Sequence, residues 1–253
     1  MLLSDLTWLE AERHLTADAV VLLPLGAAAK EHGPHLRLDN DARLAEALRD
    51  RLLSREPLPL IAAPTLTYHH YPAFVEYPGS TTLRETTARD LVVDVCASLA
   101  AFGPRRFYVL NTGVSTMRPL EAAAAALRAR GLLMAFTDLR AALEPVERSL
   151  LAQEAGSHAD EGETSMMLEL CPHRVDMGKA VRDIHERRSF RLTRDRNAEA
   201  LYSPTGVYGD ATLATREKGE ALVAAVLAAA LHDIAALRLA APPDGPPSAS
   251  PVG

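Results

Sequence analysis

The sequence predicts an α/β protein, with a mostly parallel central sheet in a three-layer α/β/α arrangement. Apolar runs alternate with longer segments of helical pattern, as in a chain of βα units. The first run, AVVLLPLG at 19–26, is continuously apolar, which is typical of a strand covered on both faces. Polar segments rich in His and Gly directly follow the expected strands, where ligands gather in such folds.

Each element follows from the same alternation. Ser4 or Asp5 can cap a first helix, and a polar, Arg- and Asp-rich region at 182–198 interrupts the pattern before the last helix. We expect one domain over 1–238 and a disordered, Pro- and Ser-rich tail over 239–253. The expected strands are 19–26, 60–67, 105–112 and 132–139, and the expected helices are 5–14, 40–54, 85–102, 117–130 and 210–237.

Composition excludes several classes of function. The chain has 253 residues and a net charge of −6, and it shows no basic run, which argues against nucleic-acid binding. Cys96 and Cys171 stand outside any ligand spacing, so we expect buried free thiols and a reducing, cytoplasmic compartment. The N-terminus lacks the pattern of a signal peptide, and the apolar run 221–231 is too short to span a bilayer. A soluble protein is expected.

The densest group of metal-ligand residue types follows the first strand, in EHGPHLRLDND. Divalent ions at hydrolytic sites bind imidazole and carboxylate, and a carboxylate can bridge two ions. Gly33 and Pro34 predict a sharp turn that aims Glu31 and His32 into one crevice. The alternative is a solvated loop in which Asp39, Asn40 or Asp41 caps the next helix. For His32 and Asp41 together we favour the metal site.

Four motifs resemble the creatininase family. PLGAAAKEHGPHLRLDND is similar to its Gly-Ser-x-Glu-Gln-His-Gly-Pro-His stretch, and YPAFVEYPGSTTL at 71–83 to its Phe-Pro-Gly-Thr segment. SHADEGETSMML at 157–168 resembles its His-Ala-Gly-x-x-Glu-Thr-Ser segment, and GVYGDATLATREKGEAL at 206–222 its Gly-Asp-Pro stretch. The motifs occur in the family's order over most of 19–235.

The resemblance implies a metal-dependent amidohydrolase that cleaves a C–N bond of a small, often cyclic, amide. Family members hold zinc or manganese, usually as two ions, and form homo-oligomers such as hexamers. His32 and the bridging Asp41 match family ligands, and His158 matches the residue assigned to proton transfer. Glu163 matches the Glu before Thr-Ser, and His35 becomes a supporting residue. Glu163 can equally complete a capping box with Asp160, and the two roles can coexist.

Two departures from the family pattern bear on the metal site. Lys30 stands where the family has its first Glu ligand, so we expect a one-residue bulge to bring Glu31 into that place, with Lys30 turned away. The alternative is that the Lys30 ammonium stands where a metal was lost. Gly113 stands at a family His ligand, which leaves one or two ions open. Further candidates for the site are His69, His70 and Glu76, which follow the second strand.

These residues lead to a hydrolytic mechanism and two alternatives. An ion held by Glu31, His32 and Asp41 would activate water and polarise the substrate carbonyl. His158 would protonate the leaving nitrogen, and Glu163 would hold a second ion or take a proton from water. The alternatives are a pseudoenzyme or small-molecule-binding protein with an incomplete metal site, and a single-ion enzyme such as a lyase or isomerase.

Overall fold

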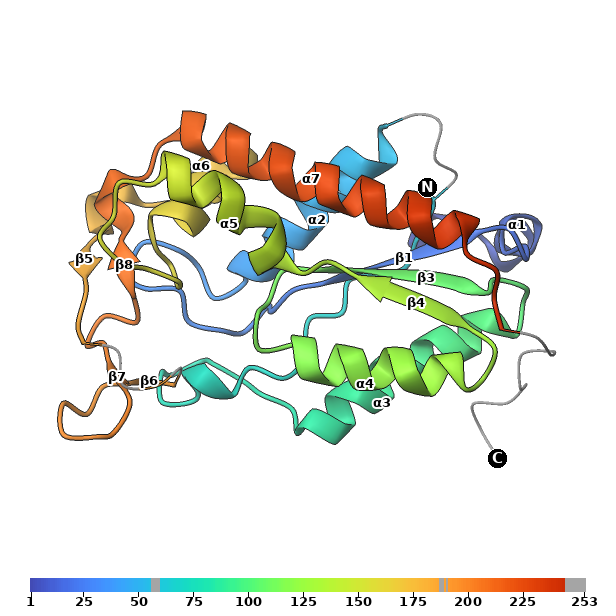
Figure 1. The fold of residues 1–253 in the computed structure, drawn as a ribbon, viewed down its shortest axis with the longest axis horizontal. Helices are drawn as coiled ribbons and strands as arrows, with labels where there is room; N and C mark the ends of the chain where they lie inside the picture. The colour runs from blue at the N-terminus through green and yellow to red at the C-terminus, as the bar shows by residue number, and fades with distance from the viewer. Residues whose placement is uncertain (56–59, 187–188, 190, 244–253) are drawn as a thin grey trace.

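The computed structural model describes residues 1–55, 60–186, 189 and 191–243. Its centre is a parallel sheet of β1 (Val20–Leu25), β2 (Leu60–Ala62), β3 (Arg106–Asn111) and β4 (Leu133–Phe136), in the order β2-β1-β3-β4. Helices cover both faces of this sheet (Figure 1). The predicted three-layer α/β fold with a parallel sheet is therefore confirmed.

Helices α2 (Asn40–Leu53), α5 (Leu139–Leu150), α6 (Glu161–Leu170) and α7 (Arg216–Leu239) lie on one side of the sheet, and α3 (Glu85–Ala100) and α4 (Met117–Arg128) lie on the other (Figure 1). The alternation along β1 explains the two layers. Val20 and Leu22 pack into the core under α2 and α7, whereas Val21, Leu23 and Leu25 pack against α3 and α4.

Short elements complete the chain. Among the described residues, 3₁₀ turns occur at Leu3–Asp5, Pro72–Phe74, Pro172–Arg174, Met177–Lys179 and Ala211–Leu213. Two small ladders pair β5 (Arg182–Asp183) with β8 (Gly209–Asp210) and β6 (Leu192–Thr193) with β7 (Leu201–Tyr202). Both ladders lie at one end of the molecule, opposite α1 (Trp8–His14) and the end of α7 (Figure 1).

Several predicted boundaries are wrong for identifiable reasons. The first helix begins at Trp8, because Thr7 and Glu10 form a capping box, and neither Ser4 nor Asp5 caps it. The second strand ends at Ala62, because the regular pairing with β1 is interrupted there and resumes only at the bridge between Leu25 and Leu66. The last helix begins at Arg216, after the Thr215 cap. Helices α5 and α6 were not predicted, and residues 244–253 of the predicted tail lie outside the described residues.

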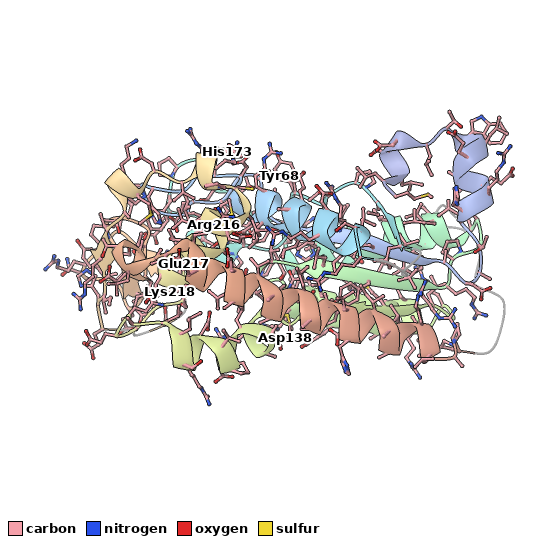
Figure 2. The ribbon with its side chains drawn as sticks, turned by 90° about the horizontal axis from the view of Figure 1, so that it is seen from above. Tyr68, Asp138, His173, Arg216, Glu217 and Lys218 are labelled. Atoms are coloured by element: carbon pink, nitrogen blue, oxygen red, sulfur yellow. The ribbon has the colours of Figure 1, made fainter. Side chains whose placement is uncertain are left out.

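Helix α7 is the one helix in the described chain that is long and apolar enough to cross a membrane by length and composition. Its buried residues, including Leu222, Val226 and Ile234, belong to the main core. Its first turn carries Arg216, Glu217 and Lys218 (Figure 2), and Lys218 pairs with the buried Glu161 of α6. We therefore interpret α7 as a core helix of the domain.

The end of β1 and the first turn of α2 approach each other closely at Gly26. A Cβ on Gly26 would stand 2.2 Å from the backbone oxygen of Asp41 and 2.8 Å from Oγ1 of Thr112. The Ala42 N–H donates to the Ala27 carbonyl over 3.0 Å across the same junction. This contact brings Asp41 to the carboxyl edge of the sheet.

Replacing Gly26 with Ala should destabilise the fold, because backbone atoms cannot move aside as a flexible side chain can. We expect Gly26→Ala to lower the free energy of unfolding by about 1–3 kcal/mol, measured by urea denaturation. Gly178→Ala is the matched control, because Gly178 is exposed and its Cβ would meet only Asp176 Oδ1, at 3.3 Å. Equal stability of Gly26→Ala and the wild type would contradict the close packing.

Glu169 of α6 joins three helices through arginines. Its carboxylate accepts from Arg51 of α2 at 2.6 Å and from Arg216 of α7 at 2.8 Å. The hydrogen bond from Arg51, together with Arg216, lowers the pKa of Glu169 despite some burial. A lowered folded pKa gives stability that is present above the unfolded pKa near 4.5 and is lost as the pH falls through the folded value.

Glu169→Gln should therefore reduce stability at pH 7 by about 1 kcal/mol or less, since both arginines are well exposed. The difference from the wild type should shrink as the pH falls below about 4.5, the unfolded pKa. Thermal unfolding followed between pH 3 and pH 7 measures this, with exposed Glu121→Gln as control. A difference that stays constant over this range would refute the ion-pair interpretation.

Candidate metal centre

The loop after β1 delivers three polar side chains to the carboxyl edge of the sheet. Gly33 adopts a φ of +67°, a conformation that favours glycine, and its N–H donates to Glu31 Oε2 over 2.9 Å. The turn leaves Lys30, Glu31 and His32 all buried. Asp41 reaches the same place from the first turn of α2, where Thr112 Oγ1 donates to its carbonyl over 3.2 Å.

His32 is held from both sides of its ring. Its Nδ1 lies 2.9 Å from the Lys30 carbonyl oxygen, and because that oxygen can only accept, Nδ1 carries a proton. Its Nε2 faces two carboxylates, 2.7 Å from Asp41 Oδ1 and 3.3 Å from Glu163 Oε1. The backbone therefore turns one defined nitrogen of His32 toward the acidic groups.

His158 is held in the corresponding way by a side chain. Its Nε2 lies 2.8 Å from Glu31 Oε1, and its Nδ1 lies 3.8 Å from Glu163 Oε2. A two-sided backbone contact with Tyr208 fixes the segment that carries it. The rings of His32 and His158 lie 5.1 Å apart, and Phe74 packs 4.4 Å from the His158 ring.

Glu163 forms only half of the expected capping box, because its carboxylate binds the Ala159 N–H and not the N–H of Asp160. Asp160 accepts from the Glu163 N–H over 3.0 Å as the N-cap of α6. The Glu163 carboxylate accepts from the Ala159 N–H at 2.8 Å and from Asn40 Nδ2 at 2.9 Å, while it also faces both histidines. Ala159 has a φ of +46°, so strained backbone supports the carboxylate.

His32, His158 and Glu163 form a group that can hold a metal ion. One ligand atom from each lies within 4.8 Å of the others. Two imidazoles and one carboxylate are the protein ligands of many catalytic zinc sites. Each imidazole is also bound through its other nitrogen, to a carbonyl or a carboxylate, as metal-ligating histidines usually are. The donors present therefore fit one divalent ion.

The same residues do not fit a second ion. Lys30 Nζ lies 2.7 Å from Asp41 Oδ2, with both side chains buried. The prediction that Lys30 turns away is wrong, because its ammonium finds a buried carboxylate and the faces of Phe74 and Tyr71, at 4.7 and 5.8 Å from their centroids. The Glu31 carboxylate is engaged by His158 and by the Gly33 N–H.

Charge pairing dominates the electrostatics of the group. Burial opposes the charged form of His32, but Asp41 and Glu163 outweigh it and raise the pKa of His32 to about 9. Burial would raise the pKa of Asp41, and the Lys30 and His32 charges hold it below its usual value. His32 likewise keeps the pKa of Glu163 well below its usual value against the effect of burial. Both carboxylates stay ionised beside their cationic partners.

The other predicted candidates lie outside the group. His35 is buried and its Nε2 lies 2.8 Å from Thr164 Oγ1, so it supports α6 next to Glu163. Burial lowers the pKa of His35 to about 4 and, equally, that of His69 to about 4. His70 Nδ1 lies 2.9 Å from the Leu83 carbonyl oxygen. Glu76 binds Arg191 and Thr193 away from the histidines.

The loop after β3 contributes structure where the family pattern places a ligand. Asn111 Oδ1 accepts from the Gly113 N–H at 3.1 Å and from Thr116 Oγ1 at 2.7 Å. Sequence reasoning did not single out Asn40, Tyr71 and Phe74, which line the group. Their position in or beside segments that follow a strand was the available signal, but Asn, Tyr and Phe are not typical ligand types.

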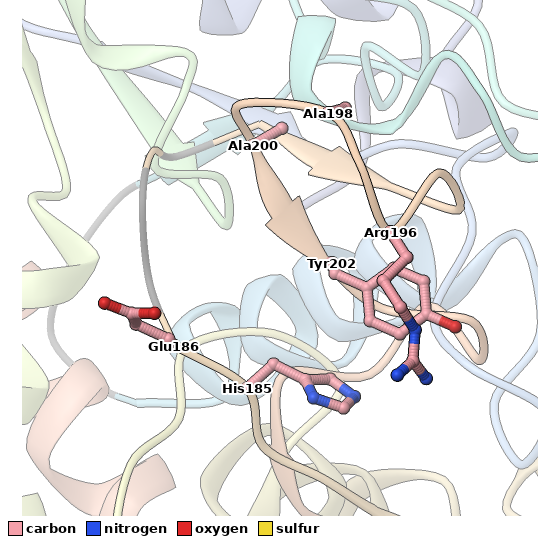
Figure 3. Close-up of a pocket in the computed structure, with 6 residues that line it drawn as sticks. All are labelled: His185, Glu186, Arg196, Ala198, Ala200 and Tyr202. Carbon is pink, nitrogen blue, oxygen red and sulfur yellow. The ribbon is translucent and has the colours of Figure 1, made fainter.

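Two cavities lie near this end of the fold. One of about 400 Å³ is lined in part by His35, Arg37, Arg174 and Lys179. A smaller one of about 170 Å³ lies by the β6–β7 ladder, and it shares none of its lining residues with the metal group (Figure 3). Its lining residues are His185, Glu186, Arg196, Ala198, Ala200 and Tyr202.

Comparison with known proteins agrees with this geometry. The family described as "Creatininase: Creatinine amidohydrolase" matches residues 4–234. The mycofactocin precursor peptide peptidase of Mycobacterium ulcerans (strain Agy99) is 29% identical over 238 residues, covering 89% of this chain and 87% of the relative. The creatinine amidohydrolase of Pseudomonas putida is 27% identical over 241 residues, covering 87% and 90%. The protein belongs to the creatininase family, and the predicted resemblance is confirmed.

Solved creatininase structures share the fold over nearly their whole length. A structure described as "Creatininase Mn" aligns with a TM-score of 0.73 at 25% identity, covering 96% of this chain and 99% of that one. A creatininase variant described as "Zn-Zn type" aligns with a TM-score of 0.72 at 25% identity, covering 96% and 98%. Manganese and zinc are thus the metals of these structural neighbours.

If Glu31 orients His158 for an ion, Glu31→Gln should weaken zinc binding. Loss of such a partner typically costs about 10–100-fold in metal affinity. Isothermal titration with Zn²⁺ measures the change, and Glu154→Gln is the control because Glu154 is exposed and pairs with Arg182 on the surface. Unchanged zinc affinity in Glu31→Gln would show that His158 needs no such support.

Proposed function

We propose that the protein is a metal-dependent hydrolase that cleaves an amide C–N bond. One observation carries the proposal: His32 and His158 are each bound through one nitrogen and each aim the other at Glu163. Family membership supports the same chemistry, since relatives of this fold are described as an amidohydrolase and as a peptidase. In the reaction, the oxygen of water would join the carbonyl carbon and a proton would reach the leaving nitrogen.

The residues have distinct parts in this scheme. His32, His158 and Glu163 would hold the ion, which when bound polarises a carbonyl and lowers the pKa of water. The Lys30 carbonyl and Glu31 keep the two imidazoles in the required tautomers. Asp41 presents Oδ1 beside His32 Nε2, where it can join the ligands or accept a proton. The Glu163 side chain is 18% exposed, so solvent reaches this member of the group.

This scheme revises the predicted part of His158. Its Nδ1 faces Glu163 among the ligand candidates, while its Nε2 is occupied by Glu31. A nitrogen that binds an ion cannot also deliver a proton. We therefore assign His158 to the ion, and the predicted proton transfer becomes the alternative.

The two possible roles of His158, metal ligand and proton donor, predict different results for His158→Ala. As a ligand, its loss should weaken zinc binding by at least about 100-fold, more than the loss of an orienting partner. As a proton donor alone, its loss would reduce turnover and leave zinc affinity unchanged. Isothermal titration separates the two, with His70→Ala as the control because His70 Nδ1 lies against the Leu83 carbonyl oxygen, outside the group. Unchanged zinc affinity in His158→Ala would contradict the ligand assignment.

We base the proposed substrate on amide hydrolysis, the chemistry that the two relatives share, and not on the name of either relative. The identities to the creatinine amidohydrolase and to the precursor peptide peptidase are nearly equal, at 27% and 29%. We propose a small amide, cyclic or peptidic, as substrate. The test is hydrolysis of creatinine and of short peptides by zinc- or manganese-loaded protein. Ring opening of creatinine is measured as formation of the open-chain acid, and peptide cleavage as formation of a new amino terminus. Absence of turnover on every amide of both classes would count against the proposal.

A binding protein without catalytic metal is the second candidate, and the Lys30–Asp41 pair favours it. Metal analysis of protein purified without chelator decides between them. Zinc, manganese or iron at about one ion per chain supports the hydrolase, whereas metal-free protein that does not bind added zinc supports the binding protein.

We further propose a cytoplasmic homo-oligomer, for which sedimentation of the purified chain gives the subunit number.

A further inference from the structure

We propose that the Lys30 ammonium takes the place of a second metal ion, so that this chain binds one divalent ion where the two-zinc relative binds two. The inference rests on the proposed function, because it presupposes an ion at His32, His158 and Glu163. It identifies Lys30 as a positioning residue that acts through Asp41.

The two oxygens of Asp41 face opposite partners. Oδ1 lies 2.7 Å from His32 Nε2, on the side of the candidate ion. Oδ2 lies 2.7 Å from Lys30 Nζ, on the other side. A carboxylate that bridges two metal ions presents one oxygen to each cation in the same manner. Asp41 therefore bridges the ion site and an ammonium.

The surroundings of Lys30 are those of a cation site. Its side chain is 7% exposed, and that of Asp41 is 1% exposed. The ammonium lies 4.7 Å from the centroid of Phe74 and 5.8 Å from that of Tyr71, and such aromatic faces attract cations. A buried ammonium is stable only with partners of this kind. The pocket is built around a permanent positive charge.

Charge balance favours a single ion. Three carboxylates gather at the group, those of Glu31, Asp41 and Glu163. One ammonium and one divalent ion match their three negative charges. A second divalent ion added beside the ammonium would leave two positive charges in excess in a buried site. The loop after β3 agrees, because Gly113 offers no side-chain ligand and Thr116 and Asn111 bond to each other there.

The test counts zinc in the full-length protein by native mass spectrometry after saturation with Zn²⁺. We expect one ion per chain in the wild type. The double variant Lys30→Glu/Gly113→His should hold two, because it replaces the ammonium by a carboxylate and adds an imidazole. A Cβ at Gly113 would lie 3.1 Å from Thr116 atoms, so a small shift of that side chain admits the new residue. Lys179→Glu, at an exposed lysine, is the control and should hold one.

The outcomes separate the inference from the proposed function. Two ions in the wild type, or one in a folded double variant, would overturn the inference and leave the hydrolase proposal intact. No ion in the wild type would overturn the proposed function, and the inference with it. Circular dichroism shows whether the double variant has folded.

A double-mutant cycle tests Lys30 even if that variant does not fold. Lys30→Met should reduce the folding equilibrium constant of the metal-free protein on the order of a hundredfold, because it removes one of the two cationic partners of the buried Asp41. In the Asp41→Asn background the same change should cost much less. Equal losses in both backgrounds would show that Lys30 merely fills space, and would overturn its part as the partner cation of Asp41.

Discussion

The close packing of the end of β1 against the first turn of α2 is the contact on which the site depends. Without a side chain at Gly26, the backbone of Asp41 lies against the strand, and Thr112 joins the two by donating to Leu25 and Asp41 carbonyls. Asp41 then faces His32, which arrives from the loop after the same strand. A longer distance between strand and helix would separate the carboxylate from the imidazole and leave both buried without partners.

That contact also explains why the group is charged yet buried. Ionised side chains are stable away from water only when each has a close partner of opposite charge or a hydrogen bond. Here Lys30 and His32 flank Asp41, and Glu163 receives the Asn40 amide and the Ala159 N–H. Helix α6 contributes Glu163 to this group. The loop after β1, the first turn of α2 and helix α6 therefore depend on one another here.

The sequence predicted the sheet and the location of the site, because both depend on local patterns. Continuous apolar runs mark strands buried on two faces, and the residues that follow them gather at one edge. Helices α5 and α6 were missed: Pro145 lies inside the first, and for the second only the possible cap formed by Asp160 and Glu163 was noted. Local sequence patterns also could not predict the orientation of the Lys30 and Glu31 side chains. It depends on Phe74, Tyr71 and His158, which tertiary packing brings together.

The hydrogen bond from His32 to the Lys30 carbonyl has a consequence for how such a site can evolve. The main chain at position 30 sets the tautomer of His32, whereas the side chain at the same position sets the charge beside Asp41. Because the carbonyl is the same for every amino acid, a substitution there can exchange an acidic ligand for an ammonium without disturbing the imidazole. The charge beside Asp41 can therefore change during evolution while the main chain at the same residue keeps the orientation of His32.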